Sequence, residues 1–463
     1  MDKKAIMDEL IKNYRRNHKN SETLFKEASR YLISGGSHNL RLFEPFPFYD
    51  AECKGSKVTD IDGNVYIDFW QGHFANVLGH NPDVVIKALT DFFNKGQGLQ
   101  TGFPSIYQKE LAKLILKRIK LEKIRFTTSG TLSTMYAIML AKAYTKRELV
   151  LKVFGGWHGA QPYVLKGITT YEKTLNKLES AGLPSNIDSQ IIVTRFNDAE
   201  DLQEKFREFG EQIACFIIEP FIGAGGFIFA NKEYLKRARE LTKEYGALLI
   251  FDEVVSGFRF HAGAVYTLYG IKPDLCVFGK AIGGGMPVSA IAGREDILEL
   301  CSPGGKPEEK VKFSGGTFSA HPASMLAGFT YLNYLIRNEN KIYPKIGKLG
   351  EKVRTEIEAI FKNYGINVKC TGYGNSIVKY SSCVGVHFLN REIEKITTPE
   401  QVWNPEICDV ELREKIFKLA MLNEGFNIFH GFGAISFAHT EEEIQSSLDA
   451  VERIAKEWSK IIK

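Results

Sequence analysis

The chain has 463 residues, 44% of them hydrophobic and 25% charged, the proportions of a globular protein with room for two or three domains. Its net charge of +5 is spread along the whole length, so the sequence predicts no nucleic-acid-binding surface. No apolar run approaches the ~20 residues that span a bilayer, and the first residues lack a secretion signal, so no membrane association is predicted. Seven cysteines without a Cys-x-x-Cys pair predict reduced thiols in a cytoplasmic protein and no metal site.

The first elements of the chain are helices followed by a hairpin. Residues 1 to about 33 place apolar side chains at helical spacing among charged ones, which predicts amphipathic helices. A glycine turn at Gly35-Gly36 comes next, and then a segment that contains Arg41 and the proline-broken aromatic run Phe43–Phe48. Val58–Phe69 predicts two strands around an Asp-Gly-Asn turn.

From about residue 70 to 325, strand-like runs alternate with helical patterns. This alternation predicts an α/β fold in which helices cover both faces of a large, mostly parallel sheet. The clearest strands are Arg125–Thr127, Leu149–Phe154, Ile191–Thr194, Cys215–Glu219, Leu248–Asp252 and Leu275–Phe278.

After about residue 330 the pattern changes to a long helical stretch, a strand–loop region near Asn375–Phe388 and two closing helices. These elements predict a smaller α+β domain. The expected division is therefore residues 1–65 as a segment that joins the small domain, 66–328 as the large domain and 329–463 as the small domain. Cys383–Cys408, with Trp403 and several charges, is interpreted as a solvated excursion of the small domain.

Two of the predicted strands end in residues that suit one cofactor. Lys280 follows Leu275–Phe278, and loss of hydration at a buried strand end favours a neutral amine that can attack a carbonyl. Asp252 ends the strand Leu248–Asp252. A lysine that forms an imine and an aspartate that holds a protonated ring nitrogen are the pair that pyridoxal phosphate requires. The alternative is an ordinary buried ion pair between the two side chains.

Three loops predict contacts to the same kind of ligand. Ser129, Gly130 and Thr131 stand where a helix begins, and a helix N-terminus can receive a phosphate; the alternative is a plain N-cap without a ligand. Trp157 lies among glycines and could stack on a flat ring, whereas a packed core tryptophan is the default interpretation. Thr317 precedes a helix and could donate to a phosphate, and a simple turn is its alternative.

The ordered set of these segments resembles the class III aminotransferases of fold type I, and within them the glutamate-1-semialdehyde 2,1-aminomutase-like branch. The similarity runs from about residue 33 to 330. Each motif alone is weakly specific, but the ordered set is highly specific. Its members are Ser129–Thr131, Trp157–Gly159, Glu219-Pro220, Phe251–Arg259 and Gly279–Pro287, with a weaker echo at Ala438–Thr440.

The resemblance implies a role for each candidate residue. Lys280 would form a Schiff base with pyridoxal phosphate and later move the substrate proton, while Asp252 would hold the ring nitrogen. Trp157 would stack on one face of the ring, and Val254 would pack on the other. The cofactor phosphate would be bound by Ser129, Gly130 and Thr131, and Thr317 would contact the phosphate of the neighbouring subunit. The active sites would therefore be shared in a homodimer.

The substrate side departs from the pattern of the resemblance. Arg41 falls where the branch keeps an arginine for the substrate carboxylate, with a surface arginine as an equally weighted alternative. His73 replaces an aromatic residue, and Ala224 replaces an asparagine near the ring hydroxyl. The loop Phe429–Ala434 is shorter than in the aminomutases and lacks their acidic residue.

We therefore expect an aminotransferase that moves an amino group between a small amino acid or amino-carboxylate and an oxo acid. An aminomutase of the glutamate-1-semialdehyde type or an amino-acid racemase would share all of the residues named except those that shape the substrate pocket. A binding protein of the same fold without turnover is the alternative from another class. The presence of both Lys280 and Asp252 weighs against a purely binding role.

Overall fold

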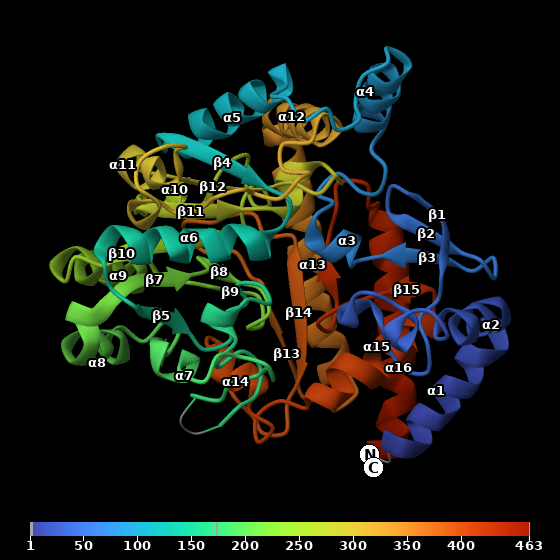
Figure 1. Ribbon diagram of the computed structural model, residues 1–463. Coiled ribbons are helices and arrows are strands. Elements are labelled where there is room, and N and C mark those ends of the chain that lie inside the picture. Colours follow the sequence, from blue (N-terminus) through green and yellow to red (C-terminus); the bar gives the residue numbers. More distant parts are fainter. Residues whose placement is uncertain (1–2, 173–174, 463) are drawn as a thin grey trace.

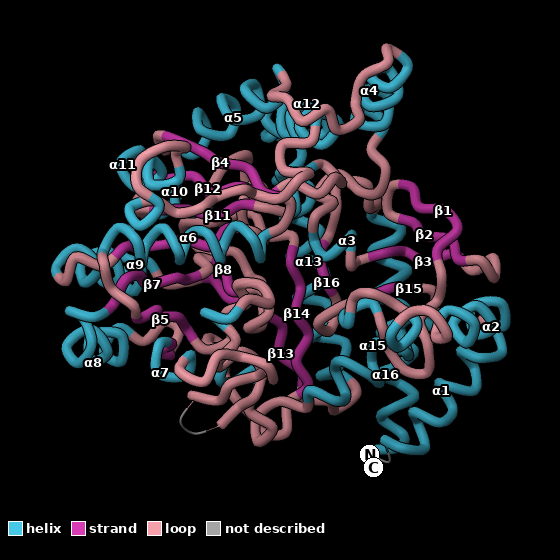
Figure 2. The backbone as a smooth tube through the Cα atoms, in the orientation of Figure 1, coloured by secondary structure: helices cyan, strands magenta, loops and turns pink. Residues whose placement is uncertain are grey.

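The computed structural model describes residues 3–172 and 175–462, and its centre is a seven-stranded sheet (Figures 1 and 2). Its strand order is β4-β12-β11-β10-β7-β5-β6. Five of these strands run parallel, from β11 to β6, and β12 runs antiparallel to both of its neighbours, β11 and β4. The bounds in that order are Lys123–Thr127, Ser289–Gly293, Leu275–Phe278, Leu248–Glu253, Ile213–Ile218, Leu149–Val153 and Ile191–Thr194.

The sheet confirms the six strands predicted for it and adds one. The unpredicted strand is β12, which consists of serine, alanine and glycine around a single isoleucine, Ile291. Such small residues carry little of the β-branched and aromatic signal by which strands are recognised. The strand forms because it completes the hydrogen bonds of β4 and β11 in the buried centre of the sheet.

Helices cover both faces of the sheet, as predicted. Successive side chains of a strand point to opposite faces, so on β7 Phe216 belongs to one core and Ile217 to the other. One face packs against α6 (Gly130–Thr145) and the other against helices that include α9 (Lys232–Glu244). Further helices of this half are α4 (Asp83–Asn94), α5 (Ile106–Ile119), α7 (Ile187–Gln190), α8 (Ala199–Phe209), α10 (Val265–Tyr269), α11 (Glu295–Leu298) and α12 (Pro322–Arg337).

A second sheet joins the two ends of the chain. The predicted hairpin is confirmed as β2 (Lys57–Asp60) and β3 (Val65–Asp68), with β1 (Asp50–Lys54) beside β2. The C-terminal strand β15 (Phe426–Asn427) pairs in parallel with β3. The predicted N-terminal helices are α1 (Lys3–Asn17) and α2 (Lys19–Ala28), and α1 packs on α15 (Lys418–Asn423).

The C-terminal part contains α13 (Glu339–Asn363), α16 (Glu441–Ile462) and the sheet β13-β14-β16. These strands are Val368–Thr371, Cys383–Phe388 and Gly433–Ala434, and Figure 2 shows β14 between the large sheet and α16. The interpretation of residues 383–408 as a solvated excursion is wrong. All six residues of β14 are buried, and Pro399 of α14 (Pro399–Trp403) packs under Gly155. Exposed residues are limited to most of the charged loop 390–395 and to Thr397, Pro405 and Glu406.

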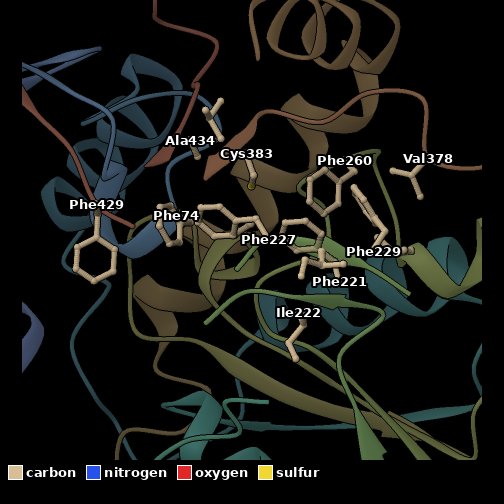
Figure 3. Close-up of a cluster of buried hydrophobic side chains, with 14 of the residues drawn as sticks. Phe74, Phe221, Ile222, Phe227, Phe229, Phe260, Val378, Cys383, Phe429 and Ala434 are labelled. Carbon is tan, nitrogen blue, oxygen red and sulfur yellow. The ribbon is translucent and has the colours of Figure 1, made fainter. Parts of the chain in front are cut away.

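A row of phenylalanines connects the parts of the fold (Figure 3). Phe74 makes edge contact with Phe227, which stacks on Phe221 near the large sheet. At the other end Phe74 lies 6.1 Å from Phe429 of the C-terminal segment. Contacts between buried aromatic side chains stabilise the packing of the chain segments that carry them. In the described residues, no helix is long and apolar enough to cross a membrane.

Candidate active site

A cavity of about 640 Å³ opens at the carboxyl ends of the parallel strands. This edge of an open α/β sheet is where such folds bind their ligands. The cavity brings together nine residues that the sequence predicted for a site: Arg41, His73, Ser129, Gly130, Thr131, Trp157, Asp252, Val254 and Lys280.

Lys280 follows β11 with a backbone φ of +45°, a conformation that is uncommon for a residue other than glycine. Burial lowers the pKa of its amine, against the opposing effect of Asp252 and Glu219. Across the described residues, Lys280 makes no hydrogen bond or ion pair, so the alternative of an ordinary Lys280–Asp252 ion pair is not what the structure contains. An amine that has no hydrogen-bond or ion-pair partner and a lowered pKa can act as a nucleophile.

Asp252, the last residue but one of β10, pairs with β11 opposite Val277, and its carboxylate is held from two sides. The backbone N–H of Val254 donates to Oδ1 at 3.0 Å, and Nδ1 of His158 lies 2.8 Å from Oδ2. Because a carboxylate only accepts, the proton of the neutral imidazole lies on Nδ1. Burial lowers the pKa of His158, which keeps the ring neutral.

Glu219 is a site residue that the sequence analysis named only within a motif. It follows β7, lines the cavity, and accepts the backbone N–H groups of Trp157 at 2.9 Å and Gly223 at 3.0 Å. Burial, with a further contribution from Asp252, raises the pKa of Glu219 to about 8. Its two carboxyl oxygens thus connect two loops of the cavity wall.

The helix α6 presents its N-terminus to the cavity. Ser129 is its N-cap: the side chain accepts from the N–H of Leu132 at 3.3 Å, and the residue is exposed to the cavity. The N–H groups of a first helical turn have no partner within the helix and attract a phosphate. A Cβ on Gly159 would lie 2.4 Å from Oγ1 of Thr131, so only glycine allows the Trp157 loop to approach this helix.

Trp157 and Val254 form two walls of the cavity near Lys280. The indole is 42% exposed and has no aromatic partner among the described residues, unlike a packed core tryptophan. Val254 lies against the start of α6, where a Cβ on Gly130 would meet its methyl groups at 3.1 Å. An open aromatic face in a narrow cavity is suited to stacking on a flat ring.

Thr317 lies outside this cavity and is exposed. The side chain of Gln100 donates to its backbone oxygen, and the N–H of Ala323 donates to the oxygen of Gly98 at 3.2 Å, so the two loops lie side by side. A Cβ on Gly316 would lie 3.9 Å from Oγ1 of Thr128, just before α6. Thr317 therefore does not line the cavity of its own chain.

Arg41 and His73 meet at the mouth of the cavity. Nε of Arg41 donates to Nε2 of His73 at 3.3 Å, and the ring of His38 lies 4.6 Å from that of His73. Burial, together with the nearby charges of His38, Arg41, Lys280 and His430, lowers the pKa of His73 to about 3. His73 is thus a neutral acceptor that orients the guanidinium.

The turn that carries His73 is strained. Four consecutive residues, Gln71–Phe74, have positive φ angles between 49° and 67°, and only one of them is glycine. Asp68 holds the turn, because its carboxylate accepts the N–H groups of Trp70 at 3.0 Å and Gln71 at 2.8 Å. Strained backbone of this kind collects at functional sites.

The cavity fits pyridoxal phosphate by the chemistry of its donors. Lys280 offers an unpaired amine, Asp252 a fixed carboxylate, Trp157 a free aromatic face and α6 a phosphate-binding helix end. Ala224, where the aminomutases place an asparagine, is half-buried and does not line the cavity. The described residues hold no cluster of metal ligands.

Comparison with known proteins agrees with this geometry. The sequence model of the family described as "Aminotransferase class-III" matches residues 43–378. A glutamate-1-semialdehyde 2,1-aminomutase from Persephonella marina is 35% identical over 444 residues, which cover 94% of this chain and 98% of the relative. A relative of the same name from Aquifex aeolicus is 34% identical over 445 residues, 94% of this chain and 99% of the relative.

Solved structures share the fold over almost the whole length. An ω-transaminase from Sphaerobacter thermophilus is 26% identical, covers 95% of this chain and 98% of its own, and has a TM-score of 0.83. A β-phenylalanine aminotransferase from Variovorax paradoxus is also 26% identical, covers 98% of this chain and 97% of its own, and has a TM-score of 0.84.

Proposed function

We propose that this chain, which belongs to the class-III aminotransferases and uses pyridoxal phosphate, moves an amino group from a small carboxylate-bearing amine to an oxo acid. One observation carries the choice of residues. The unpaired amine of Lys280 shares a single cavity with the Asp252–His158 pair on one side and the Arg41–His73 pair on the other. Covalent attachment and carboxylate recognition are thus available together.

The cofactor supplies a ring that takes up the electron pair left on the substrate carbon when that carbon loses its proton. The chain supplies everything else in the proposal. Lys280 holds the cofactor and, once released, carries the proton, a task for which a neutral amine is required. Asp252 keeps the ring nitrogen protonated, and the N–H of His158 keeps Asp252 in place.

The other residues orient the reactants in this proposal. Ser129, Gly130 and Thr131 hold the phosphate, while Trp157 and Val254 confine the ring between two faces. The guanidinium of Arg41 grips the substrate carboxylate, with His73 as the acceptor that fixes its direction. Glu219 acts through the backbone of Trp157, whose loop it ties to the neighbouring Gly223 turn.

We propose that the enzyme is a cytoplasmic homodimer. Leu99, Phe103 and Phe318 expose large apolar side chains on the loops that flank Thr317. A second copy that covers this surface would bring Thr317 to the phosphate of its partner. The cytoplasm is supported by seven cysteines that are all free thiols.

A mixing experiment tests the shared site. Lys280→Ala and Thr317→Ala subunits are each impaired alone, but a mixed dimer with Thr317 acting across the interface has one site with both residues intact. Activity at limiting cofactor should therefore rise when the two proteins are unfolded and refolded together. No rise would mean that Thr317 acts within its own subunit or not at all.

The second candidate function is the aminomutase activity after which the 35% identical relative is named. The two reactions differ in their net products. An aminotransferase turns the donor into an oxo compound and a separate oxo acid into an amine, whereas an aminomutase returns an isomer of its one substrate with the amino group on the adjacent carbon. Chromatography with mass spectrometry separates the two, applied to the products of glutamate-1-semialdehyde alone and of a screen of donors with and without an added oxo acid. Isomerisation of glutamate-1-semialdehyde without an added oxo acid, together with no transfer from any donor to an oxo acid, would overturn the aminotransferase proposal.

A further inference from the structure

Lys418, the first residue of α15, is a buried cation that the proposed chemistry does not use. It is 7% exposed, and its side-chain ammonium group forms no hydrogen bond or ion pair with any described residue. A charged group without such a partner is costly inside a protein, and an apolar side chain of the same length would fill the space. The presence of a lysine at this buried position therefore indicates that its charge has a function.

Three aromatic rings surround this ammonium group. Its Nζ atom lies 4.5 Å from the ring centre of Phe43, 5.5 Å from that of Phe429 and 5.6 Å from that of Trp70. Trp70 and Phe429 stack on each other at 4.7 Å with an angle of 7° between their planes. The electron-rich faces of such rings attract a cation, and the attraction is stronger where water is excluded.

Each ring belongs to a segment that reaches the substrate side of the cavity. Phe43 follows Arg41 by two residues, and Trp70 packs on His73 with ring centres 4.5 Å apart. Phe429 precedes His430, whose charge acts on His73, and in Figure 3 it stands at the end of the aromatic row beside Phe74. The three segments come from the N-terminus, the strained turn and the C-terminus, and Lys418 is where they meet.

The local backbone keeps Lys418 free for this contact. A π-helical stretch, Leu412–Phe417, runs directly into α15, and π-helical turns often mark functional positions. Glu414 lies one turn before Lys418 but is engaged elsewhere, with Arg413 at 2.8 Å and with Nδ1 of His430 at 3.1 Å. The cation is thus directed to the rings and not to the nearest carboxylate.

We propose that Lys418 is a positioning residue for carboxylate recognition: its cation–π contacts with Phe43, Trp70 and Phe429 hold the Arg41 and His73 segments together at the substrate side of the cavity. This inference rests on the proposed function, in which Arg41 binds the carboxylate.

The test uses two probes that combine with the aldehyde of pyridoxal phosphate in any such enzyme and differ in one carboxylate. Aminooxyacetate carries the carboxylate and methoxyamine lacks it. The half-saturating concentration of each is read from the cofactor absorbance of the holoenzyme. Lys418→Met keeps the length and removes the charge, so the value for aminooxyacetate should rise about five- to tenfold while that for methoxyamine stays within about twofold. Lys418→Arg, which keeps the cation, should restore the original value.

Lys415→Met is the matched control, because Lys415 is an exposed lysine three residues away, and both values should stay unchanged. Equal changes for the two probes, or no change for either, would overturn the inference. If Lys418→Met does not fold, Phe43→Leu removes the nearest ring and should reproduce the selective loss; an unselective result there would also overturn it. Arg41→Lys, measured in parallel, distinguishes failure of the proposed function from failure of this inference. If Arg41→Lys leaves the half-saturating concentrations of both probes unchanged, the proposed carboxylate site is contradicted. If Arg41→Lys weakens aminooxyacetate selectively and Lys418→Met does not, only the positioning role of Lys418 is contradicted.

Discussion

Asp252 and His158, 94 residues apart in the chain, share a buried contact of 2.8 Å beneath the cavity that also holds Lys280. The contact fixes the tautomer of the histidine and the direction of the carboxylate. The other oxygen of Asp252 accepts the backbone N–H of Val254 at 3.0 Å, so each carboxylate oxygen already has one partner. The carboxylate is therefore held in a fixed direction, as the proposed contact with a protonated ring nitrogen requires.

Asp252→Asn should slow turnover by about a hundredfold or more, because it keeps the shape but removes the charge that holds a ring nitrogen protonated. Cofactor affinity should fall far less. Single-turnover kinetics and cofactor titration measure the two effects separately. Asp274→Asn is the control, a buried carboxylate away from the cavity that should affect stability but not turnover. Nearly unchanged turnover in Asp252→Asn would assign this task to another acid.

Gly159→Ala should weaken cofactor binding and destabilise the fold. Its φ is +84°, and the new Cβ would lie 2.6 Å from the Cα of Thr131, so the Trp157 loop must move away from the start of α6. The expected cost is about 1–3 kcal/mol, measured by chemical unfolding and by titration with pyridoxal phosphate.

Gly182→Ala is the matched control for Gly159→Ala. Gly182 has a similar φ of +74° with nothing within 4 Å of the added Cβ. Its substitution should show the backbone cost alone and leave cofactor affinity unchanged. Equal loss of affinity in the two variants would contradict a phosphate site at this loop.

Arg41→Lys should reduce kcat/KM for a carboxylate-bearing donor about ten- to a hundredfold or more, since a charge-assisted hydrogen bond contributes roughly 1.5–3 kcal/mol. Lysine keeps the charge but cannot form two parallel hydrogen bonds to a carboxylate. Amines without a carboxylate should change little, and the cofactor spectrum should not change. Equal effects on both kinds of donor would make Arg41 structural.

Lys418→Met should alter how stability depends on pH. Burial lowers the pKa of Lys418 from 10.5 to about 8, so between these values the unfolded chain binds a proton that the native chain does not. Stability from this group therefore rises with pH from about 8 to 10.5, and its cost is fully present below pH 8. The variant should lose that rise, which urea unfolding at several pH values measures. A variant that keeps the same rise would contradict a buried ammonium group at this position.

The sequence predicted the sheet and the strand-end positions of Lys280 and Asp252 well because both depend on local patterns. Buried strands such as Leu275–Phe278 are short apolar runs, and Lys280 and Asp252 stand at their ends. Parallel strands bring their carboxyl ends to one edge, so the residues that follow them meet in one cavity. Residues of β12 were missed because their signal comes from the neighbouring strands that they join.

The substrate side could not be predicted in this way. The contact between Arg41 and His73 depends on a turn of four residues with positive φ. Among these four, only Gly72 is a residue type from which a positive φ can be predicted. The three aromatic rings around the Lys418 ammonium group come from three distant segments of the chain. No spacing of residues along the sequence therefore predicts this contact. The His158 contact to Asp252 is likewise tertiary, although the histidine stands in a motif that was noted for its tryptophan.

The most direct test of the account is reduction of the native holoenzyme with borohydride, followed by mass-spectrometric mapping of the modified peptide. The unpaired, buried amine of Lys280 predicts that the cofactor becomes fixed to this residue alone, and that Lys280→Ala binds the cofactor without any fixation. Fixation to another lysine, such as the buried Lys152 or Lys418, would contradict the assignment of the active site.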